Sequence, residues 1–313
     1  MKVLITGING FVGSNFSRKW NGKYILYGLD INPILNAGVE KIFAWEQLKD
    51  IPHTDAIIHL AGKAHDTKDS SLADSYFEIN TCLTQKVFDY FLQSEARTFI
   101  FFSSVKAAAD TVEGDILTEE IIPKPVGPYG ESKIKAEEYI LTRSRELKIG
   151  NKRIFILRPA MIYGPGNKGN LNLLYNVVRK GIPWPLGAYE NKRSFCSVNN
   201  IAYVVEQLMV RENIESGIYH MCDDEALSTN ELIRLIATSL GKKAHIWKFP
   251  RNMVNVLAGI GSVLHLPLNR ERLKKLTENY VVSNEKIKHA LNIAQLPDSL
   301  PEGLMRTFDS FRK

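Results

Sequence analysis

The sequence has few cysteines and no recognisable metal-binding pattern. Its three cysteines, Cys82, Cys196 and Cys222, are scattered and form no C-x-x-C pair. This spacing excludes a disulfide scaffold and is typical of free thiols in a reducing compartment. Because H-E-x-x-H is also absent, we predict no metal site. The chain begins with a strand-like segment rather than a secretory leader, so we expect a cytoplasmic protein.

Long apolar runs and a strong local charge bias are also lacking. The 40 basic and 34 acidic residues give a net charge of +6, and they are interspersed without a nucleic-acid-binding module, so we expect no nucleic-acid partner. The longest apolar stretch, residues 253–268, is interrupted by polar residues and is too short to cross a bilayer. Its helical spacing beside basic residues favours a core helix. Peripheral contact with an anionic membrane is the alternative.

Apolar segments alternate with helical patterns in the first half of the 313-residue chain. We expect strands at residues 3–6, 24–29, 56–61, 98–102 and 153–157, and helices at residues 11–20, 72–94 and 129–144. In the helix over 72–94, the apolar face should include Tyr76, Ile79, Leu83, Val87 and Phe91. The alternation predicts an α/β fold with a doubly wound parallel sheet.

The composition changes near residue 164, where we expect a domain boundary. Residues 164–193 are rich in Gly, Pro and Asn around one expected helix, 171–180. Further helices are expected at 229–240, after the capping box Ser228-Thr-Asn-Glu, and at 251–265. We expect a first domain of residues 1–164 with 194–221, and a smaller, mainly α-helical domain of residues 165–193 with 222–313.

A glycine-rich turn joins the first expected strand to the first expected helix. Gly7, Gly10 and Gly13 follow the spacing G-x-x-G-x-x-G. Glycine permits positive φ and a close approach of phosphate, and the helix N-terminus supplies free N–H groups to a pyrophosphate. Asp30 ends the second strand, where a carboxylate accepts from a ribose 2′-hydroxyl and repels a 2′-phosphate. The first domain is therefore predicted to be of Rossmann type and to bind NAD in preference to NADP.

A tyrosine and a lysine lie four residues apart in the helix expected at 129–144. On a helix, Tyr129 and Lys133 share one face, and a nearby cation lowers the pKa of a phenol so that it can act as a base. Such pairs also arise by chance, and Tyr139–Arg143 and Tyr175–Arg179 are two further examples. Tyr129 is distinguished by its position after Pro128, a favourable first helical residue.

A hydroxyl group follows the strand expected at residues 98–102. Ligands of an open parallel sheet bind beyond the carboxyl ends of its strands, where Ser104 is placed. Its hydroxyl can hydrogen-bond a substrate oxygen, and the alternative is that it caps a turn. By itself Ser104 does not decide between these roles.

Taken together, these motifs resemble the extended short-chain dehydrogenase/reductases that act on nucleotide sugars, the NAD-dependent epimerase/dehydratase family. The resemblance extends over almost the whole chain and implies a catalytic triad of Ser104, Tyr129 and Lys133. It implies a cofactor site formed by Gly7, Asn9, Gly10, Phe11, Val12, Gly13, Asp30, Ile31, Leu60, Ala61, Gly62, Asn80, Tyr129, Lys133 and Pro159. Substrate contacts are implied for Ser104 and Arg193. Asn170 is a further candidate for contact with the sugar or phosphate, and a plain loop residue is the alternative. Arg193 would pair with the diphosphate, with a solvated surface arginine as the alternative.

Within the family, the chain is most similar to the bacterial UDP-glucose 4-epimerase-like subgroup of surface-polysaccharide biosynthesis. This resemblance implies a cytoplasmic homodimer packed through the helices at 72–94 and 129–144, and a 4-epimerase acting on UDP-glucose, UDP-galactose or a UDP-N-acetylhexosamine. The alternative is an NAD(P)H-dependent reductase of a nucleotide-linked 4-keto-6-deoxy sugar. A 4,6-dehydratase is disfavoured, because Val105-Lys106 stand where dehydratases have Asp-Glu. A non-catalytic dinucleotide-binding protein is disfavoured because all three triad residues are present.

Overall fold

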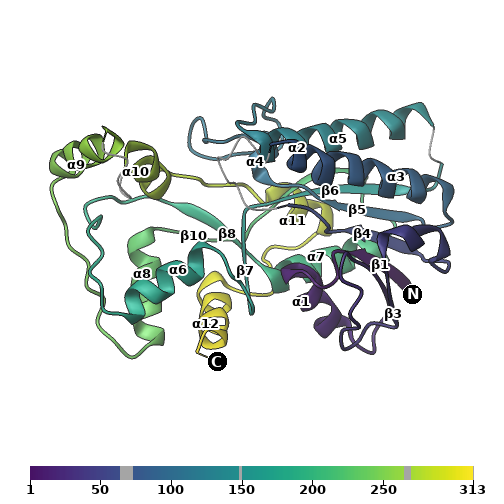
Figure 1. The fold of residues 1–313 in the computed structure, drawn as a ribbon, viewed down its shortest axis with the longest axis horizontal. Coiled ribbons are helices and arrows are strands. Elements are labelled where there is room, and N and C mark those ends of the chain that lie inside the picture. Colours follow the sequence, from purple (N-terminus) through teal and green to yellow (C-terminus); the bar gives the residue numbers. More distant parts are fainter. Residues whose placement is uncertain (64–72, 148–149, 264–268, 313) are drawn as a thin grey trace.

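The computed structural model describes residues 1–63, 73–147, 150–263 and 269–312. Within these residues, seven parallel strands form one open sheet (Figure 1). In spatial order they are β3 (Lys41–Phe43), β2 (Ile25–Leu29), β1 (Lys2–Thr6), β4 (Ala56–His59), β5 (Thr98–Phe102), β6 (Arg153–Pro159) and β9 (Gly217–Met221). The chain builds outward in opposite directions from β1 and β4, which creates the crevice where such sheets bind ligands. The predicted doubly wound fold is confirmed.

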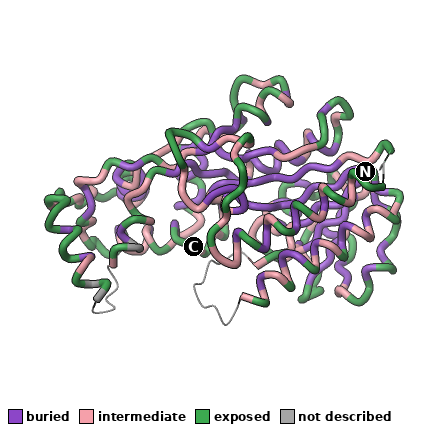
Figure 2. Tube along the Cα trace, turned by 90° about the horizontal axis from the view of Figure 1, so that it is seen from above, coloured by how far each residue is buried: buried purple, intermediate pink, exposed green. Residues whose placement is uncertain are grey.

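Helices cover both faces of this sheet. The segments of β4 and β5, AIIH and TFIFF, are buried at every position, as expected of parallel strands with both faces covered. On one face lie α1 (Phe11–Trp20), α7 (Val198–Val210) and α11 (Glu285–Leu291); on the other lie α3 (Leu83–Gln93) and α5 (Pro128–Glu146). In Figure 2 the strands of the sheet are mainly purple, the colour of buried residues, while green on the surrounding helices marks exposed residues.

The helix expected over residues 72–94 is not regular. Its first residue lies outside the described part of the chain, and the rest forms α2 (Ala73–Tyr76), the π-helix η3 (Phe77–Cys82) and α3. A π-turn contains an extra residue and so rotates the face that follows it. Asn80 and Thr84 are consequently buried, whereas Ile79 and Leu83 are only half-buried. The predicted apolar face was therefore wrong at these positions, and the helix turns polar groups inward.

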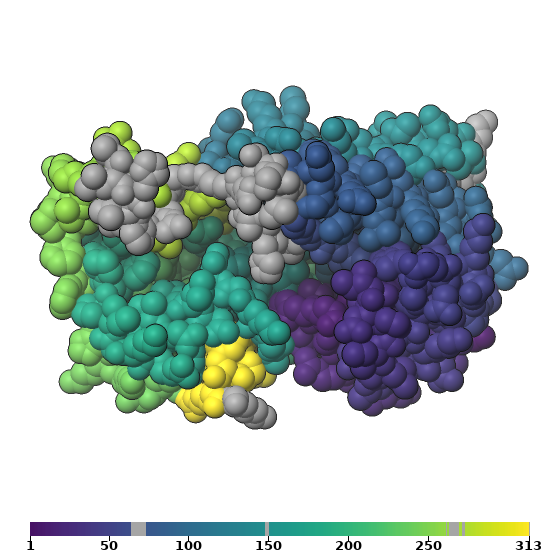
Figure 3. Space-filling model, in the orientation of Figure 1, coloured from purple at the N-terminus to yellow at the C-terminus, as the bar shows by residue number. Residues whose placement is uncertain are grey.

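Segments from the second half of the chain form a smaller part beside the sheet, coloured mainly teal, green and yellow in Figure 3, while α7, β9 and α11 belong to the main sheet and its helices. Three further strands, β7 (Met161–Tyr163), β8 (Arg193–Ser197) and β10 (Ala226–Leu227), pair in the order β10-β8-β7. An apolar cluster joins them to α6 (Asn170–Arg179), α8 (Thr229–Ser239) and α12 (Leu300–Ser310). At the far end lie α9 (Arg251–Val263) and α10 (Arg270–Thr277) (Figure 1).

Sequence and structure agree less closely in this second part. The capping box is present, since Ser228 Oγ accepts from Glu231 N at 3.1 Å and Glu231 Oε2 accepts from Ser228 N at 2.8 Å. The helix expected at 251–265 is seen as α9, and its last two expected residues lie outside the described ranges. In this half of the chain, the expected elements did not include β7, β8, β9, β10, α7, α10, α11 or α12. The predicted first domain includes residues 194–221, which contain most of β8 and all of β9. Strand β9 joins the main sheet, whereas β8 pairs with β7 and β10. The division into two domains stays a prediction.

Candidate active site

The turn between β1 and α1 requires glycine at two positions. Gly7 has φ +69°, and a Cβ there would lie 2.9 Å from the backbone nitrogen of Ala61. A Cβ on Gly13 would lie 2.5 Å from the carbonyl oxygen of Ile8. The N-cap of α1 is Gly10, which has no side chain to cap the first turn. The first N–H groups of α1 are thus left for an external anion, and this suits the pyrophosphate of a dinucleotide.

Asp30 is connected directly to this turn. Its Oδ2 accepts from the backbone N–H of Asn9 at 3.0 Å, and its Oδ1 accepts from that of Asn32 at 3.2 Å. The side chain of Asn9 donates to the carbonyl of Asn32 at 2.7 Å and to that of Ile34 at 3.1 Å. A carboxylate oxygen can accept two hydrogen bonds, and each oxygen of Asp30 accepts one of those just named, so Asp30 keeps capacity for a ribose hydroxyl. Ile31 is largely exposed beside it.

Lys133 is a buried cation at the carboxyl-terminal edge of the sheet. Its Nζ donates to the carbonyl of Phe102 at 2.8 Å and lies 5.0 Å from the ring centroid of Phe101. Burial lowers the pKa of Lys133 to about 8, against the opposing effect of the Glu137 carboxylate. The ammonium therefore stays mostly protonated at neutral pH. Gly62 approaches it closely, since a Cβ there would be 3.1 Å from Nζ.

Asn80 links the loop after β4 to the first turn of α5. Its Oδ1 accepts from the backbone N–H of Lys63 at 2.8 Å, and its Nδ2 donates to Ser132 Oγ at 3.0 Å. Ser132 Oγ in turn donates to the carbonyl of Tyr129 at 2.9 Å. The extra residue of the π-helix thus places an amide where it fixes the backbone of the predicted catalytic tyrosine. Sequence reasoning identified Asn80 through the family resemblance, but it did not identify Ser132 as its partner.

The elements that carry Ser104 and Tyr129 are packed against each other. Ser104 is the N-cap of α4 (Val105–Ala108), and its Oγ accepts from the backbone N–H of Lys106 at 3.2 Å. A Cβ on Gly130 would lie 2.5 Å from the carbonyl oxygen of Lys106, so α5 begins in direct contact with α4. Tyr129 is half-buried, with its ring centroid 6.3 Å from that of Tyr76. Both roles considered for Ser104 remain open, since it caps a turn and also lies at the ligand-binding edge.

Behind Lys133 lies a buried ion pair that the sequence analysis missed. Glu137 and Arg158 are both almost fully buried, and Arg158 Nη2 is 2.6 Å from Glu137 Oε2, with Nε 3.0 Å from Oε1. The hydroxyl of Ser103 also donates to Glu137. Two signals were available: an arginine in a buried strand needs a counter-charge, and Glu137 lies four residues after Lys133 on one helix face.

The other predicted residues divide between the two parts of the molecule. Further cofactor residues lie at the carboxyl-terminal edge of the main sheet, namely Phe11 and Val12 in the first turn of α1, Leu60 after β4 and Pro159 at the end of β6. The predicted substrate residues come from the smaller part. Asn170 is exposed at the start of α6, and Arg193 is half-buried at the start of β8, where its Nη1 donates to the carbonyl of Lys275 in α10.

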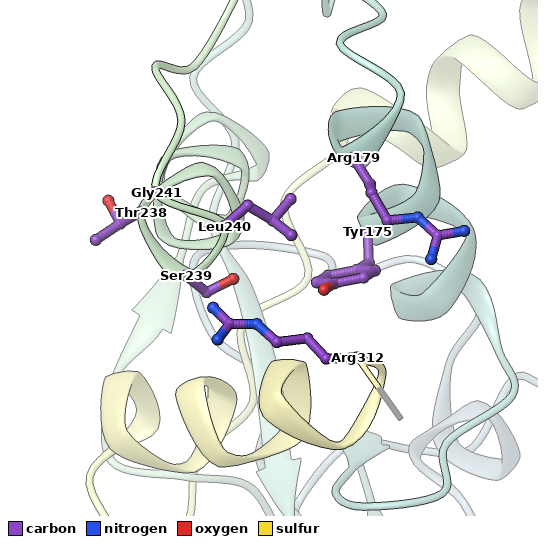
Figure 4. A pocket seen from close by; sticks show the side chains of 7 residues that line it. All are labelled: Tyr175, Arg179, Thr238, Ser239, Leu240, Gly241 and Arg312. Carbon is purple, nitrogen blue, oxygen red and sulfur yellow. The ribbon is translucent and has the colours of Figure 1, made fainter.

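A surface hollow of about 590 Å³ lies elsewhere, between the carboxyl ends of α6, α8 and α12 (Figure 4). Its lining consists of Tyr175, Arg179, Thr238, Ser239, Leu240, Gly241 and Arg312, none of which was predicted as a site residue. In the described ranges, no group of three or more His, Cys, Asp or Glu side chains is placed to hold a metal ion. No described helix is both long enough and apolar enough to cross a membrane.

The sheet order, the glycine turn and Asp30 define an α/β dinucleotide-binding protein of Rossmann type. A comparison with known families agrees with this class of protein and identifies the family. Residues 3–222 match the sequence model of the NAD dependent epimerase/dehydratase family, and the chain belongs to that family. The predicted family and its cofactor, NAD, are therefore confirmed, and the glycine turn fits the cofactor's pyrophosphate.

The chain is similar to curated members of this family over most of its length. It is 30% identical to a UDP-glucose 4-epimerase of Vibrio cholerae, covering 79% of this chain and 78% of the relative. It is 26% identical to the N-acetyl-alpha-D-glucosaminyl-diphospho-ditrans,octacis-undecaprenol 4-epimerase of Escherichia coli O157:H7, covering 97% and 93%. The solved UDP-glucose 4-epimerase of Thermotoga maritima, in complex with UDP-glucose, has a TM-score of 0.77 at 22% identity and covers 100% of this chain and 99% of that one. This likeness at low identity shows the fold.

Proposed function

We propose that the protein is an NAD-dependent 4-epimerase of hexoses linked through a diphosphate, with UDP-glucose, UDP-galactose or a UDP-N-acetylhexosamine as substrate. The observation that carries this proposal is the buried Lys133 ammonium, which lies one helical turn after Tyr129 at the carboxyl-terminal edge of the sheet. The names of the Vibrio and Escherichia relatives support the reaction, since both specify 4-epimerisation of a hexose. The two names differ in the carrier of the sugar, and UDP is our choice for this chain.

The side chains of the triad would handle the proton of the sugar 4-hydroxyl. The glycine turn and Asp30 would hold NAD, which would supply a reversible hydride acceptor for C4 of the sugar. Tyr129, as phenolate, takes the proton from the 4-hydroxyl and gives it back when the alcohol re-forms. The Lys133 ammonium stabilises the phenolate and lowers its pKa. The hydroxyl of Ser104 hydrogen-bonds the 4-oxygen and orients it.

The smaller part of the molecule would hold the diphosphate and leave the sugar free to turn. A guanidinium donates two parallel hydrogen bonds to phosphate oxygens, which suits Arg193, and Asn170 would contact the sugar or the phosphate. The sugar must present its other face before the hydride returns, so the pocket has to accept two orientations. The predicted homodimer, packed through α3 and α5, and a role in surface-polysaccharide biosynthesis belong to the same proposal.

Proton NMR tests the reaction directly. UDP-N-acetylglucosamine and UDP-glucose are incubated separately with the purified protein, without added cofactor. We expect the resonances of the C4 epimer to appear, because an epimerase regenerates its NAD in every turnover. Unchanged spectra, combined with NADH or NADPH oxidation when a nucleotide-linked 4-keto-6-deoxy sugar is supplied, would instead identify the reductase.

A further inference from the structure

The excess positive charge of the chain is concentrated in one segment. Residues 242–277 contain eight lysines and arginines and one acidic residue. Outside this segment the 40 basic and 34 acidic residues are reduced to 32 and 33, so the rest of the molecule is nearly neutral. The segment includes α9, α10 and the connection from α8. A local excess of this size produces a positive field at one end of the molecule.

Helix α9 in this segment has two separate apolar faces. One face is buried, with Val254 and Ala258 in a cluster that includes Leu186 and Leu273. A second apolar stripe points into solvent, with side chains that are 41–62% exposed: Met253, Val256, Leu257 and Ile260. The spacing i, i+3, i+4, i+7 places these four on one side of the helix. An exposed apolar stripe of this kind indicates a binding surface rather than a scattered exposed residue.

Cations lie on both sides of the stripe along the chain. Lys248 precedes it, and Arg270 and Lys274 follow it in α10; all three are exposed. Arg251 also precedes the stripe, but its Nε donates to the carbonyl of Ala188 at 3.1 Å and its guanidinium lies over the Tyr189 ring, on the buried side of α9. A helix with an apolar face and a basic surround lies in the plane of a membrane interface, with apolar side chains below the headgroups and cations among them. Anionic lipid complements this charge, and each lysine or arginine near the surface contributes about 1 kcal/mol of attraction.

We propose that the stripe of α9, together with Lys248, Arg270 and Lys274, docks the protein on the surface of an anionic membrane. We call these residues the α9–α10 surface. Figures 1 and 2 place α9 at the end of the molecule away from the N-terminus, with much of its outer side exposed. In Figure 1 most of the main sheet lies towards the other end of the molecule from α9.

Helix α10, which carries part of this surface, contacts a residue of the predicted substrate site. Arg193 donates to the carbonyl of Lys275 in α10. Docking through α10 would therefore fix the element against which the predicted diphosphate-binding arginine rests. The proposal goes beyond the proposed reaction and does not depend on it, because membrane binding is measured without sugar or cofactor.

Co-sedimentation with vesicles tests the docking. The full chain is mixed with phosphatidylcholine vesicles, with and without phosphatidylglycerol, at low and at high salt. We expect binding only to the anionic vesicles, with a partition coefficient that falls as salt screens the cations. Trp247, which is 53% exposed shortly before α9, gives a second readout. Its fluorescence should shift to shorter wavelength with anionic vesicles, and Trp247→Phe should remove that shift.

Paired variants distinguish membrane binding through the α9–α10 surface from nonspecific binding to vesicles. Val256→Gln with Leu257→Gln should lower the partition coefficient about tenfold or more, because apolar area leaves the interface. Lys248→Gln with Lys274→Gln should lower it about 30-fold at low salt. The matched controls are Leu173→Gln, which is 65% exposed on α6, and Lys180→Gln, which is exposed at the end of that helix. Both controls should bind like the unaltered protein.

Several outcomes would overturn the proposal. Equal binding to neutral and anionic vesicles, or variants that bind as well as the controls, would exclude the α9–α10 surface. Binding to a labelled oligonucleotide without binding to vesicles would assign the cations to nucleic acid. A dimer in sedimentation velocity that the Val256→Gln and Leu257→Gln double variant converts to monomer would show that the stripe covers a second copy. Circular dichroism of each variant verifies that the fold is retained.

Discussion

Two regions of the molecule depart from the usual distribution of polar and apolar side chains, and they do so in opposite ways. At the carboxyl-terminal edge of the sheet, Lys133, Glu137 and Asn80 are buried and bonded to neighbouring groups. On the α9–α10 surface, apolar side chains are exposed and the cations face solvent. Buried polar groups and exposed apolar stripes are the informative exceptions in a protein. We therefore assign chemistry to the first region and association to the second.

The largest effect in the first region should come from Tyr129→Phe. Removing the hydroxyl removes the proposed base while the ring contact with Tyr76 is retained. We expect turnover to fall about 100-fold to 10,000-fold, with NAD binding nearly unchanged. Turnover is measured by NMR and NAD binding by calorimetry. Tyr175→Phe, at a tyrosine that also precedes an arginine by four residues, is the matched control and should keep full activity. Turnover like that of the unaltered protein in Tyr129→Phe would remove this residue from the mechanism.

A stability measurement contrasts the buried ion pair with the exposed stripe. Arg158→Met leaves the buried Glu137 carboxylate without its guanidinium partner, which should lower the free energy of unfolding by about 3–5 kcal/mol. Leu257→Gln replaces an exposed side chain and should change it by less than about 0.5 kcal/mol. Urea unfolding at neutral pH gives both values. Equal losses for the two variants would show that the regions do not differ in the way described.

Acid should destabilise the sheet region in part through His59, besides the buried His220 of β9, whose pKa burial lowers to about 4. This buried ring lies between Thr6 Oγ1, at 2.6 Å, and Thr84 Oγ1, at 2.9 Å. Burial, with a smaller effect of the Lys133 charge, lowers the pKa of His59 to about 3, so that it stays neutral in the folded protein. The unfolded histidine titrates near its usual value of about 6.5, and stability is therefore lost as the pH falls from there towards 3.

At pH 5 the loss from His59 should amount to about 2 kcal/mol relative to pH 7. His59→Gln should reduce the difference in unfolding free energy between these two pH values by about that amount. The control is His245→Gln, at an exposed histidine in the segment before α9, which should leave the difference unchanged. A pH dependence that is the same in His59→Gln and in the unaltered protein would assign the acid sensitivity to other groups.

Some helices and strands were predictable from sequence, and others were not. The helix α1 and the strand β5 were predicted with the bounds that the structure shows, because the glycine turn fixes where α1 begins and β5 is a continuous apolar run. The strands β7 and β10 escaped prediction since they have only a few residues and no alternation to detect. Helix α7 was missed because its segment was interpreted only as a return of the chain to the first domain.

Candidate site residues could be predicted from sequence where a residue type at a given position points to a particular backbone conformation or a particular chemical role. Glycines in a turn, an aspartate at a strand end and a tyrosine one turn before a lysine are signals of this kind. The π-helix was not predictable, because side chains alone do not indicate an extra residue in a turn, and the buried position of Thr84 followed from it. The Glu137–Arg158 pair joins a helix to a strand, so the sequence can indicate that a buried Arg158 needs a counter-charge, but only the fold shows which carboxylate supplies it.

The smallest effect we predict concerns the cofactor preference set by Asp30. In Asp30→Ala the carboxylate no longer accepts from the ribose or repels a 2′-phosphate, so NAD affinity should fall about tenfold and NADP affinity much less. The turn around Asn9 also loses a hydrogen bond, which weakens both cofactors equally. Asp30→Asn retains an acceptor for that bond and removes only the charge. Calorimetric titration of both variants with both cofactors therefore separates the two contributions, and equal losses for NAD and NADP in Asp30→Ala would contradict a role in selection.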